Sequence, residues 1–169
     1  MGNNIILIGM PGAGKSTMGV LLAKVSGMDF IDTDLVIQAK EKRLLHKILE
    51  EDGVDGFLAI EEQINASIQA EHTVIATGGS VIYGPRAMEH LRSIGTVVYL
   101  RLSYSTIAAR LFNIRGRGVV LRENQTLQDL YEERCELYEK YAHVTVDEEG
   151  LGIEETVEKT LQAMKMLLE

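Results

Sequence analysis

Hydrophobic residues follow two alternating patterns along the chain. Short, almost continuously apolar runs rich in β-branched residues alternate with longer stretches whose apolar positions recur at helical spacing. Four of the short runs are continuous, so we expect strands buried on both faces, as in a parallel sheet between helical layers. The fifth run, residues 143–147, alternates polar and apolar positions, which suits a sheet edge. The predicted strands are residues 4–9, 29–32, 73–77, 96–101 and 143–147.

Helical periodicity separates these runs, and the strand-then-helix order predicts a doubly wound α/β fold. One stretch, residues 35–69, is helical throughout and long for a single crossover connection, so we expect an inserted helical region over the sheet edge. No Pro/Ser-rich linker or internal repeat divides the chain, which predicts one domain over residues 1–169. The other predicted helices are residues 15–26, 85–93, 106–112, 127–140 and 153–168.

Composition narrows the functional classes. The 169 residues carry a net charge of -8, which argues against a surface that coats nucleic acid. Cys135 is the single cysteine, which excludes an internal disulfide framework and a multi-thiolate metal site. No apolar run approaches the roughly 20 residues of a membrane span, and the N-terminus shows no basic leader. We therefore expect a cytoplasmic protein with neither nucleic acid nor membrane as partner.

The strongest motif lies between the first predicted strand and the first predicted helix. Residues 9–16 read Gly-Met-Pro-Gly-Ala-Gly-Lys-Ser, which matches the phosphate-binding pattern G-x-x-x-x-G-K-[ST]. Its glycines allow backbone N–H groups to surround a phosphate, and the helix N-terminus adds partial positive charge. Lys15 supplies a cation for the β- and γ-phosphates, and Ser16 a hydroxyl ligand for Mg²⁺. The predicted nucleotide contacts here are Gly12, Ala13, Gly14, Lys15, Ser16 and Thr17.

Two carboxylates follow the second predicted strand, in Asp32-Thr33-Asp34. The third and fourth predicted strands end without an acid, so by elimination the metal-side carboxylate comes from this segment. If the segment is extended, residues i and i+2 point the same way and both carboxylates face the site. One can hold Mg²⁺ through water while the other takes the proton of an acceptor hydroxyl. The alternative is that either Asp caps the next helix.

Positive charge is concentrated between residues 101 and 122. This stretch has five arginines and no acid, and its centre, Arg115-Gly116-Arg117-Gly118, has the composition of a lid that closes over a transferring phosphoryl group. A solvated basic segment is the alternative. Arg134 lies among acidic residues, where a helix ion pair would explain it.

Together these motifs resemble the shikimate kinase family over nearly the whole chain. The resemblance rests on the phosphate loop, Asp32-Thr33-Asp34, Thr77-Gly78-Gly79-Ser80-Val81, the Arg/Gly lid and the run 130–138. It implies a five-stranded, P-loop, nucleoside-monophosphate-kinase-like fold with an acceptor-binding region at about residues 34–70 and a lid at about 113–124. It also implies transfer of the ATP γ-phosphate to the 3-hydroxyl of shikimate with Mg²⁺. We expect a monomer that acts in aromatic amino acid biosynthesis.

The resemblance also implies roles for individual residues. Lys15 would contact phosphates, with Ser16 and Asp32 on the magnesium and Asp34 as the base. In the other half of the site, Phe57 would belong to the acceptor pocket. The remaining implied contacts are Gly78 and Gly79 (backbone N–H groups to the acceptor), Arg110 (adenine), Arg117 (phosphates, from the lid) and Arg134 (substrate carboxylate).

Three positions depart from the family pattern. The family motif Phe-Arg-x-x-Glu reads Phe57-Leu58-Ala59-Ile60-Glu61 here. Leu58 therefore occupies the substrate-binding position where the family has an arginine that binds the carboxylate. Losing the partner of a buried charge costs several kcal/mol, equivalent to about a hundredfold in affinity. Arg134, Lys42 or Arg43 would then have to compensate. Thr77 replaces the first glycine of a triplet, which ordinary backbone angles would permit, and Gly118 replaces a lid proline.

Several functions therefore remain open at this stage. The first is phosphorylation of shikimate, and the second is phosphorylation of another hydroxylated metabolite with less negative charge, because Leu58 makes part of the pocket apolar. A third is a non-catalytic, ATP-binding regulatory module. The presence of Lys15, Ser16, Asp32 and Asp34 argues against the third. A nucleoside monophosphate kinase fits the acceptor region less well.

Overall fold

The computed structural model describes residues 2–113 and 121–169, and five parallel strands form its single sheet. The strand order is β2-β3-β1-β4-β5, with β5 at one edge, as its alternating sequence predicts. All residues of β1 and β3, and all but the last of β4, are buried, which confirms the prediction of buried strands for three of the four continuous apolar runs. The prediction is wrong for β2, which is exposed or half-buried throughout because it forms the other edge of the sheet and pairs with β3 alone. The strands are β1 (Asn4–Ile8), β2 (Asp29–Asp32), β3 (Thr73–Ala76), β4 (Gly95–Arg101) and β5 (Val144–Asp147).

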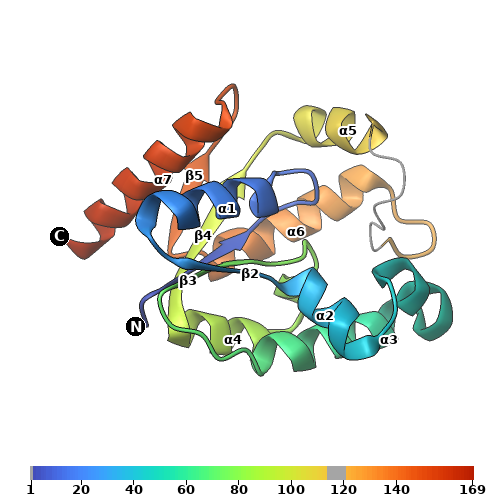
Figure 1. Ribbon diagram of the computed structural model, residues 1–169. Coiled ribbons are helices and arrows are strands. Elements are labelled where there is room, and N and C mark those ends of the chain that lie inside the picture. Colours follow the sequence, from blue (N-terminus) through green and yellow to red (C-terminus); the bar gives the residue numbers. More distant parts are fainter. Residues whose placement is uncertain (1, 114–120) are drawn as a thin grey trace.

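Helices cover both faces of the sheet, which confirms the doubly wound α/β class (Figure 1). The helices α1 and α7 pack against each other on one face, and α4 and α6 pack on β4 from the other. No helix of the described residues is long and apolar enough to cross a membrane. These helices are α1 (Lys15–Ser26), α4 (Pro85–Ile94), α5 (Tyr104–Asn113), α6 (Leu127–Tyr141) and α7 (Ile153–Leu168), with a short 3₁₀ helix, η1 (Val81–Tyr83).

The long helical stretch after β2 is two helices, α2 (Thr33–Glu41) and α3 (Leu45–Ala66). Gly53 interrupts α3 with a φ of 73°, in the left-handed region where glycine costs least. This pair has a small apolar core of its own, separate from the core under the sheet, which confirms an inserted helical region. The second core is formed by Ile37, Ile48, Phe57 and Ile64.

Strand register brings the candidate site together at the carboxyl edge of the sheet. Leu7 of β1 and Asp32 of β2 both pair with Ala76 of β3, so these three strands end at the same level. The phosphate loop, the start of α2 and the turn at residues 77–80 therefore lie side by side. In parallel α/β sheets this edge is where ligands bind.

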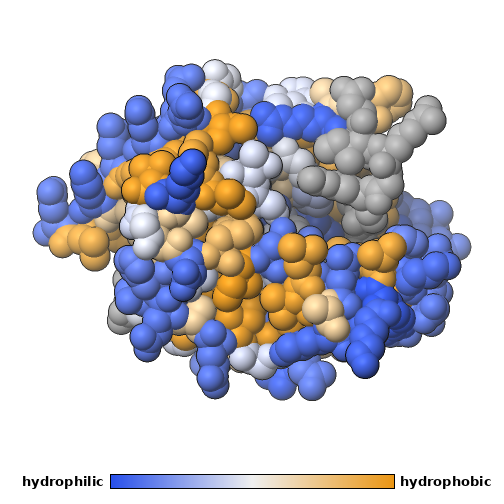
Figure 2. All heavy atoms as spheres, in the orientation of Figure 1, coloured by the Kyte–Doolittle hydropathy of each residue, from blue (hydrophilic) through white to orange (hydrophobic). Residues whose placement is uncertain are grey.

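The surface around this edge is largely hydrophilic, with apolar side chains gathered in two places (Figure 2). One group lies over α1, where Val20 and Val25 are more than half exposed. The other lies over α2 and the start of α3, with Leu35 and Leu44 exposed. The second group borders the acceptor side of the site.

Candidate active site

The phosphate loop joins β1 to α1 and is shaped by its glycines. Gly12 and Gly14 have φ values of 86° and 84°, a conformation that costs most other residues about 1–2 kcal/mol. Lys15 is buried, and its Nζ donates to the carbonyl oxygens of Gly9 at 2.7 Å and Met10 at 2.8 Å. The amide of Ala13 donates to Met10 O within the same turn. The carbonyl groups of the loop therefore hold the Lys15 ammonium group by hydrogen bonds.

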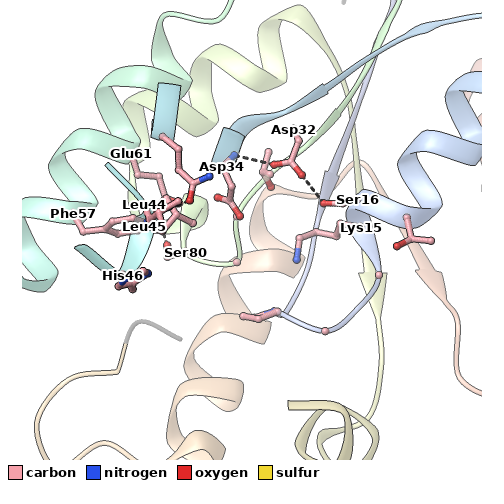
Figure 3. Close-up of a pocket in the computed structure, with 18 of the residues that line it drawn as sticks. Lys15, Ser16, Asp32, Asp34, Leu44, Leu45, His46, Phe57, Glu61 and Ser80 are labelled. Carbon is pink, nitrogen blue, oxygen red and sulfur yellow. Dashed lines mark hydrogen bonds between the residues drawn. The ribbon is translucent and has the colours of Figure 1, made fainter. Parts of the chain in front are cut away.

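Ser16 and Asp32 meet across the cavity, from the first turn of α1 and the end of β2. The Ser16 hydroxyl donates to Asp32 Oδ2 at 2.8 Å, and Asp32 Oδ1 accepts from the backbone N–H of Asp34 at 3.0 Å (Figure 3). Asp32 thus caps α2, because Thr33 is already helical. The prediction of an extended 32–34 segment is wrong at Thr33, yet Asp34 in the first turn of α2 still lines the cavity.

A hydroxyl and a carboxylate in contact form a donor set that suits Mg²⁺, which prefers oxygen ligands. Among the described residues there is no group of three or more His, Cys, Asp or Glu side chains able to hold a metal. Magnesium in phosphoryl-transfer sites commonly takes one or two protein oxygens and completes its shell with phosphates and water. The Ser16–Asp32 pair fits that arrangement.

Asp34 and Glu61 converge on Gly78. A Cβ on Gly78 would lie 2.8 Å from Asp34 Oδ1 and 2.9 Å from Glu61 Oε2, so only glycine leaves room for both carboxyl groups. Glu61 Oε1 accepts from Ser80 Oγ at 2.7 Å, while Oε2 has no hydrogen-bond partner within the described part of the chain. Sequence reasoning assigned Glu61 no role, although its position in the Phe57–Glu61 motif was the available signal.

Burial changes the titration of Glu61. The side chain is 2% exposed, and loss of water raises its pKa to about 7; the nearby charge of Asp34 acts in the same direction. The Ser80 hydrogen bond and the positive charges of Arg134 and Lys15 lower the pKa by less. Two carboxyl groups with unlike environments therefore stand beside the same glycine.

Arg134 reaches the cavity from inside the molecule. It is 1% exposed, and its guanidinium carbon lies 5.5 Å from the centre of the Tyr83 ring. Gly79 makes this approach possible, because a Cβ there would lie 2.9 Å from Arg134 Nη1. Tyr138 fixes the same turn by donating to Gly79 O at 2.6 Å. Arg134 is therefore a buried part of the pocket wall rather than a residue of the exposed face of α6.

One cavity of about 550 Å³ joins these groups. Of the predicted site residues it is lined by Gly12, Gly14, Lys15, Ser16, Thr17, Asp32, Asp34, Phe57, Gly78, Gly79 and Arg134. Ala13, Leu58 and Arg110 do not line it, and Arg117 and the centre of the predicted lid lie outside the described residues. Sequence reasoning missed the contributions of Pro11, Gln38, Leu44, Leu45, His46, Glu61, Thr77 and Ser80.

Arg110 and Glu148 lie beside the phosphate loop instead. Arg110 Nη1 donates to Gly12 O at 2.9 Å, which ties α5 to the loop. Glu148 is 6% exposed, and burial raises its pKa to about 7, although the charges of Arg110 and Lys15 oppose the rise. Sequence reasoning overlooked Glu148, since nothing in the run Asp147-Glu148-Glu149 distinguishes a buried acid from exposed ones.

Comparison with known proteins decides the family. The family model for shikimate kinase matches residues 11–165. The chain belongs to the shikimate kinase family. A shikimate kinase from Thiobacillus denitrificans is 39% identical over 148 residues, 86% of this chain and 81% of that protein. One from Thermodesulfovibrio yellowstonii is 36% identical over 167 residues, 97% of this chain and 96% of that protein.

Solved structures agree on the fold. Shikimate kinase from Acinetobacter baumannii, in complex with shikimate, has a TM-score of 0.88 at 32% identity, over 98% of this chain and 94% of that one. A gluconokinase from Sinorhizobium meliloti shares the fold alone. Its TM-score is 0.58 at 22% identity, over 98% of this chain and 93% of that one. Membership of the shikimate kinase family makes this chain an ATP-dependent phosphotransferase acting on a hydroxyl group, and confirms the predicted resemblance.

Leu58 is the departure from the shikimate kinase pattern with the largest structural consequence. Its side chain is half-buried and packs on the apolar core of α2 and α3, outside the cavity lining. The assignment of Leu58 to the substrate-binding residues stays a prediction, and in this structure its short apolar side chain packs on its own cluster. Thr77, the milder departure, has no positive φ, and its hydroxyl donates to Leu7 O at 2.8 Å. A threonine fits there without strain, as expected.

Neither basic neighbour replaces the missing arginine. The Arg43 guanidinium forms ion pairs with Glu41 at 2.7 Å, and with Glu51 and Asp52 at 2.9 Å. These contacts hold it at the corner between α2 and α3, away from the cavity. Lys42 is exposed and also stays outside the lining. The hypothesis that either residue compensates for Leu58 receives no support from this arrangement.

Proposed function

We propose that this protein transfers the γ-phosphoryl group of ATP to the 3-hydroxyl of shikimate, with Mg²⁺ as the metal. The observation that carries the proposal is one cavity containing the phosphate loop, Asp34 and Arg134. Phosphoryl transfer to a hydroxy acid needs a phosphate cradle, a group that accepts the hydroxyl proton and a cation for the carboxylate. Each of these is present in that single space.

The nucleotide half of the site consists of the loop and its flanking residues. Lys15 neutralises charge on the β- and γ-phosphates, and the backbone N–H groups of residues 12–17 surround them. Arg110, tied to Gly12 O, stacks near the adenine. The resemblance to the family assigns Arg117, which lies outside the described residues, to the phosphates. Ser16 and Asp32 would hold Mg²⁺, which when bound would supply charge neutralisation at the phosphates.

Asp34 acts as the base for the acceptor. The 3-hydroxyl oxygen forms a bond to the γ-phosphorus as the bond from that phosphorus to the β–γ bridging oxygen breaks. The hydroxyl proton passes to the Asp34 carboxylate, and ADP leaves. Glu61, whose pKa is raised to about 7, supplies a proton-bearing carboxyl group on the other side of Gly78 that donates a hydrogen bond to the acceptor.

The acceptor is positioned by the remaining wall of the cavity. Arg134 pairs with its carboxylate, Gly78 and Gly79 present backbone N–H groups, and Phe57 packs on the ring. The test is ADP release with MgATP and shikimate against MgATP alone, with the phosphorylated product identified by ³¹P NMR. Failure of millimolar shikimate to raise ADP release above the MgATP background overturns the proposal.

A second candidate keeps the reaction and changes the acceptor. Leu44, Leu45 and Phe57 give one end of the cavity an apolar wall, which favours a hydroxylated metabolite carrying less negative charge. A panel of polyols, hydroxy acids and nucleosides in the same assay separates the two candidates. If the whole panel stays silent while ATP still binds, a regulatory nucleotide-binding module replaces both.

The proposal also includes a monomeric, cytoplasmic enzyme that binds neither nucleic acid nor membrane. The net charge of -8 supports the exclusion of nucleic acid. The other parts are predictions from the sequence. Sedimentation of the purified chain tests the oligomeric state, and cell fractionation tests the location.

A further inference from the structure

The cavity contains as many acidic groups as groups able to carry positive charge. Asp32, Asp34 and Glu61 line it, against Lys15, Arg134 and His46. An acceptor that carries a carboxylate adds another negative charge beside those acids. The placement of the three basic groups therefore determines whether such an acceptor is bound or rejected.

Two of these basic groups, Lys15 and Arg134, are held in place by other parts of the protein. Lys15 Nζ lies against the carbonyl oxygens of Gly9 and Met10, at the phosphate end of the cavity. Arg134 is 1% exposed, and its guanidinium carbon lies 5.5 Å from the centre of the Tyr83 ring, so its position is restricted by burial and by that contact. A carboxylate has two oxygens and about four lone-pair sites, so it can accept from a second donor as well as from Arg134.

His46 is placed differently from both. It lies in the first turn of α3, is solvent-exposed, and lines the cavity together with Phe57 and Glu61. Figure 3 shows these three residues at the end of the pocket away from Lys15, with Asp34 between. An imidazole at this position donates an N–H to an anionic oxygen when neutral, and adds a positive charge when protonated.

Other basic residues of α2 and α3 do not take this place. Arg43 is held by three carboxylates, and Lys47 Nζ pairs with Glu50 at 3.1 Å. Neither contributes to the lining of the cavity, and Leu58 packs away from it. Across the described residues of α2 and α3, His46 is the basic side chain that reaches the cavity.

We propose that His46 is a specificity-determining residue that binds the anionic group of the acceptor together with Arg134. It thereby gives this chain a preference for a carboxylate acceptor over an uncharged polyol of the same shape. The inference rests on the proposed function, because it concerns the acceptor half of that site. His46 contacts neither the phosphates nor the reacting hydroxyl in this assignment.

The test compares shikimate with its carboxamide, which has the same ring and hydroxyl groups without the charge. Steady-state kinetics give kcat and KM for each acceptor, and calorimetry in the presence of MgADP gives binding without turnover. The variants are His46→Ala, His46→Lys and, as a matched control, Lys47→Ala, which removes a positive charge one residue away and outside the cavity. Alanine is well tolerated in an exposed helix, so folding is retained.

We expect His46→Ala to raise the KM for shikimate by about tenfold, the effect of one charge-assisted hydrogen bond, with kcat changed by less than about twofold. The KM values for ATP and for the carboxamide stay within about twofold, His46→Lys restores shikimate binding, and Lys47→Ala matches the wild type. An equal loss for both acceptors, or no loss for either, overturns the inference.

The two proposals fail in distinguishable ways. If the wild type binds shikimate more tightly than the carboxamide, and His46→Ala removes that preference, the inference stands even where no phosphorylated product forms. If shikimate is phosphorylated but His46→Ala keeps the preference, the proposed function stands and the inference falls. If the wild type binds neither acceptor, both fall.

Discussion

The nucleotide half and the acceptor half of the cavity are built in different ways. The nucleotide half comes from one continuous segment, residues 9–17, in which backbone groups and glycine conformations form the site. The acceptor half combines side chains from α2, α3, the turn at residues 77–80 and α6. Asp34, Glu61 and Arg134 are brought together there by packing between elements distant in sequence.

The difference explains which half tolerates change. Backbone N–H groups bind any phosphate chain of the right shape, so the loop needs its glycines and one lysine whatever the acceptor is. In the acceptor half, specificity resides in side chains held by separate helices, so a single replacement there can change the acceptor contacts without disturbing the loop. We therefore expect substitutions in the two halves to have separable kinetic effects.

The largest effect is expected for Asp34→Asn, in the acceptor half. The amide keeps the size of the side chain but cannot take the hydroxyl proton, so kcat falls by about a thousandfold. ATP binding remains, because the phosphates are held by the other half. The measurement is coupled ADP release for kcat and fluorescent-nucleotide titration for binding.

Asp29→Asn is the matched control for this change. Asp29 begins β2, is exposed and lies outside the cavity lining, so its substitution leaves both quantities within about twofold. Turnover retained in Asp34→Asn would remove Asp34 as the base.

Two glycine substitutions compare the halves directly. Gly14→Ala leaves Cβ in open space but forces a φ of 84° on alanine, so we expect about a tenfold rise in the KM for ATP. Gly78→Ala places Cβ within 3 Å of the Asp34 and Glu61 carboxylates, which must move. Displacing the base lowers kcat/KM for the acceptor by about a hundredfold.

Full kinetics with each substrate varied in turn separate these outcomes. Circular dichroism confirms that both variants fold. The division of the cavity into two halves is wrong if Gly14→Ala changes the kinetics of the acceptor as strongly as those of ATP. It is equally wrong if Gly78→Ala changes the kinetics of ATP as strongly as those of the acceptor.

The sequence predicted the nucleotide half almost completely, because that half is local. A strand, a glycine pattern and a helix in immediate succession determine the loop, and both Lys15 and Ser16 line the cavity. The presence of all five strands, and the position of β5 at an edge, follow from apolar periodicity in the same way, whereas the position of β2 at the other edge does not. Short-range sequence patterns are enough to predict a site whose residues are neighbours both in the sequence and in space.

The acceptor half was predicted only in part, for a physical reason. Asp34 and Arg134 followed from the family resemblance, but whether a residue on α3 faces the cavity depends on how that helix rotates onto its own small core. Leu58 turned toward that core, while His46 and Glu61, which had no assigned role, face the cavity. Asp32 also caps α2, which begins at Thr33 and so places Asp34 on a helix, whereas the sequence predicted an extended segment there.

Leu58→Arg tests how far the apolar replacement limits the acceptor half. A guanidinium group is long enough to leave the α2–α3 core and reach a carboxylate, so we expect kcat/KM for shikimate to rise by about tenfold, mainly through KM. The KM for ATP stays unchanged. Leu58→Met, which keeps the volume without adding a donor, is the control. An unchanged KM for shikimate in Leu58→Arg would contradict a missing cation as the limit on binding.

Stability should also change with pH, through two buried acids: Glu61 in the acceptor half and Glu148 beside the phosphate loop. The pKa values of Glu61 and Glu148 are both raised from an ordinary 4.5 to about 7 by burial. Between these values the folded chain keeps a proton that the unfolded chain has released, so each group stabilises the fold less as pH rises from about 4.5 to about 7. Glu61→Gln and Glu148→Gln should each remove part of that decline, and the double variant more than either. Urea unfolding midpoints at pH 5 and pH 8 measure this loss of stability. If the midpoint of Glu61→Gln falls between the two pH values as much as that of the wild type, Glu61 has the same pKa in the folded and unfolded protein, and the prediction is wrong.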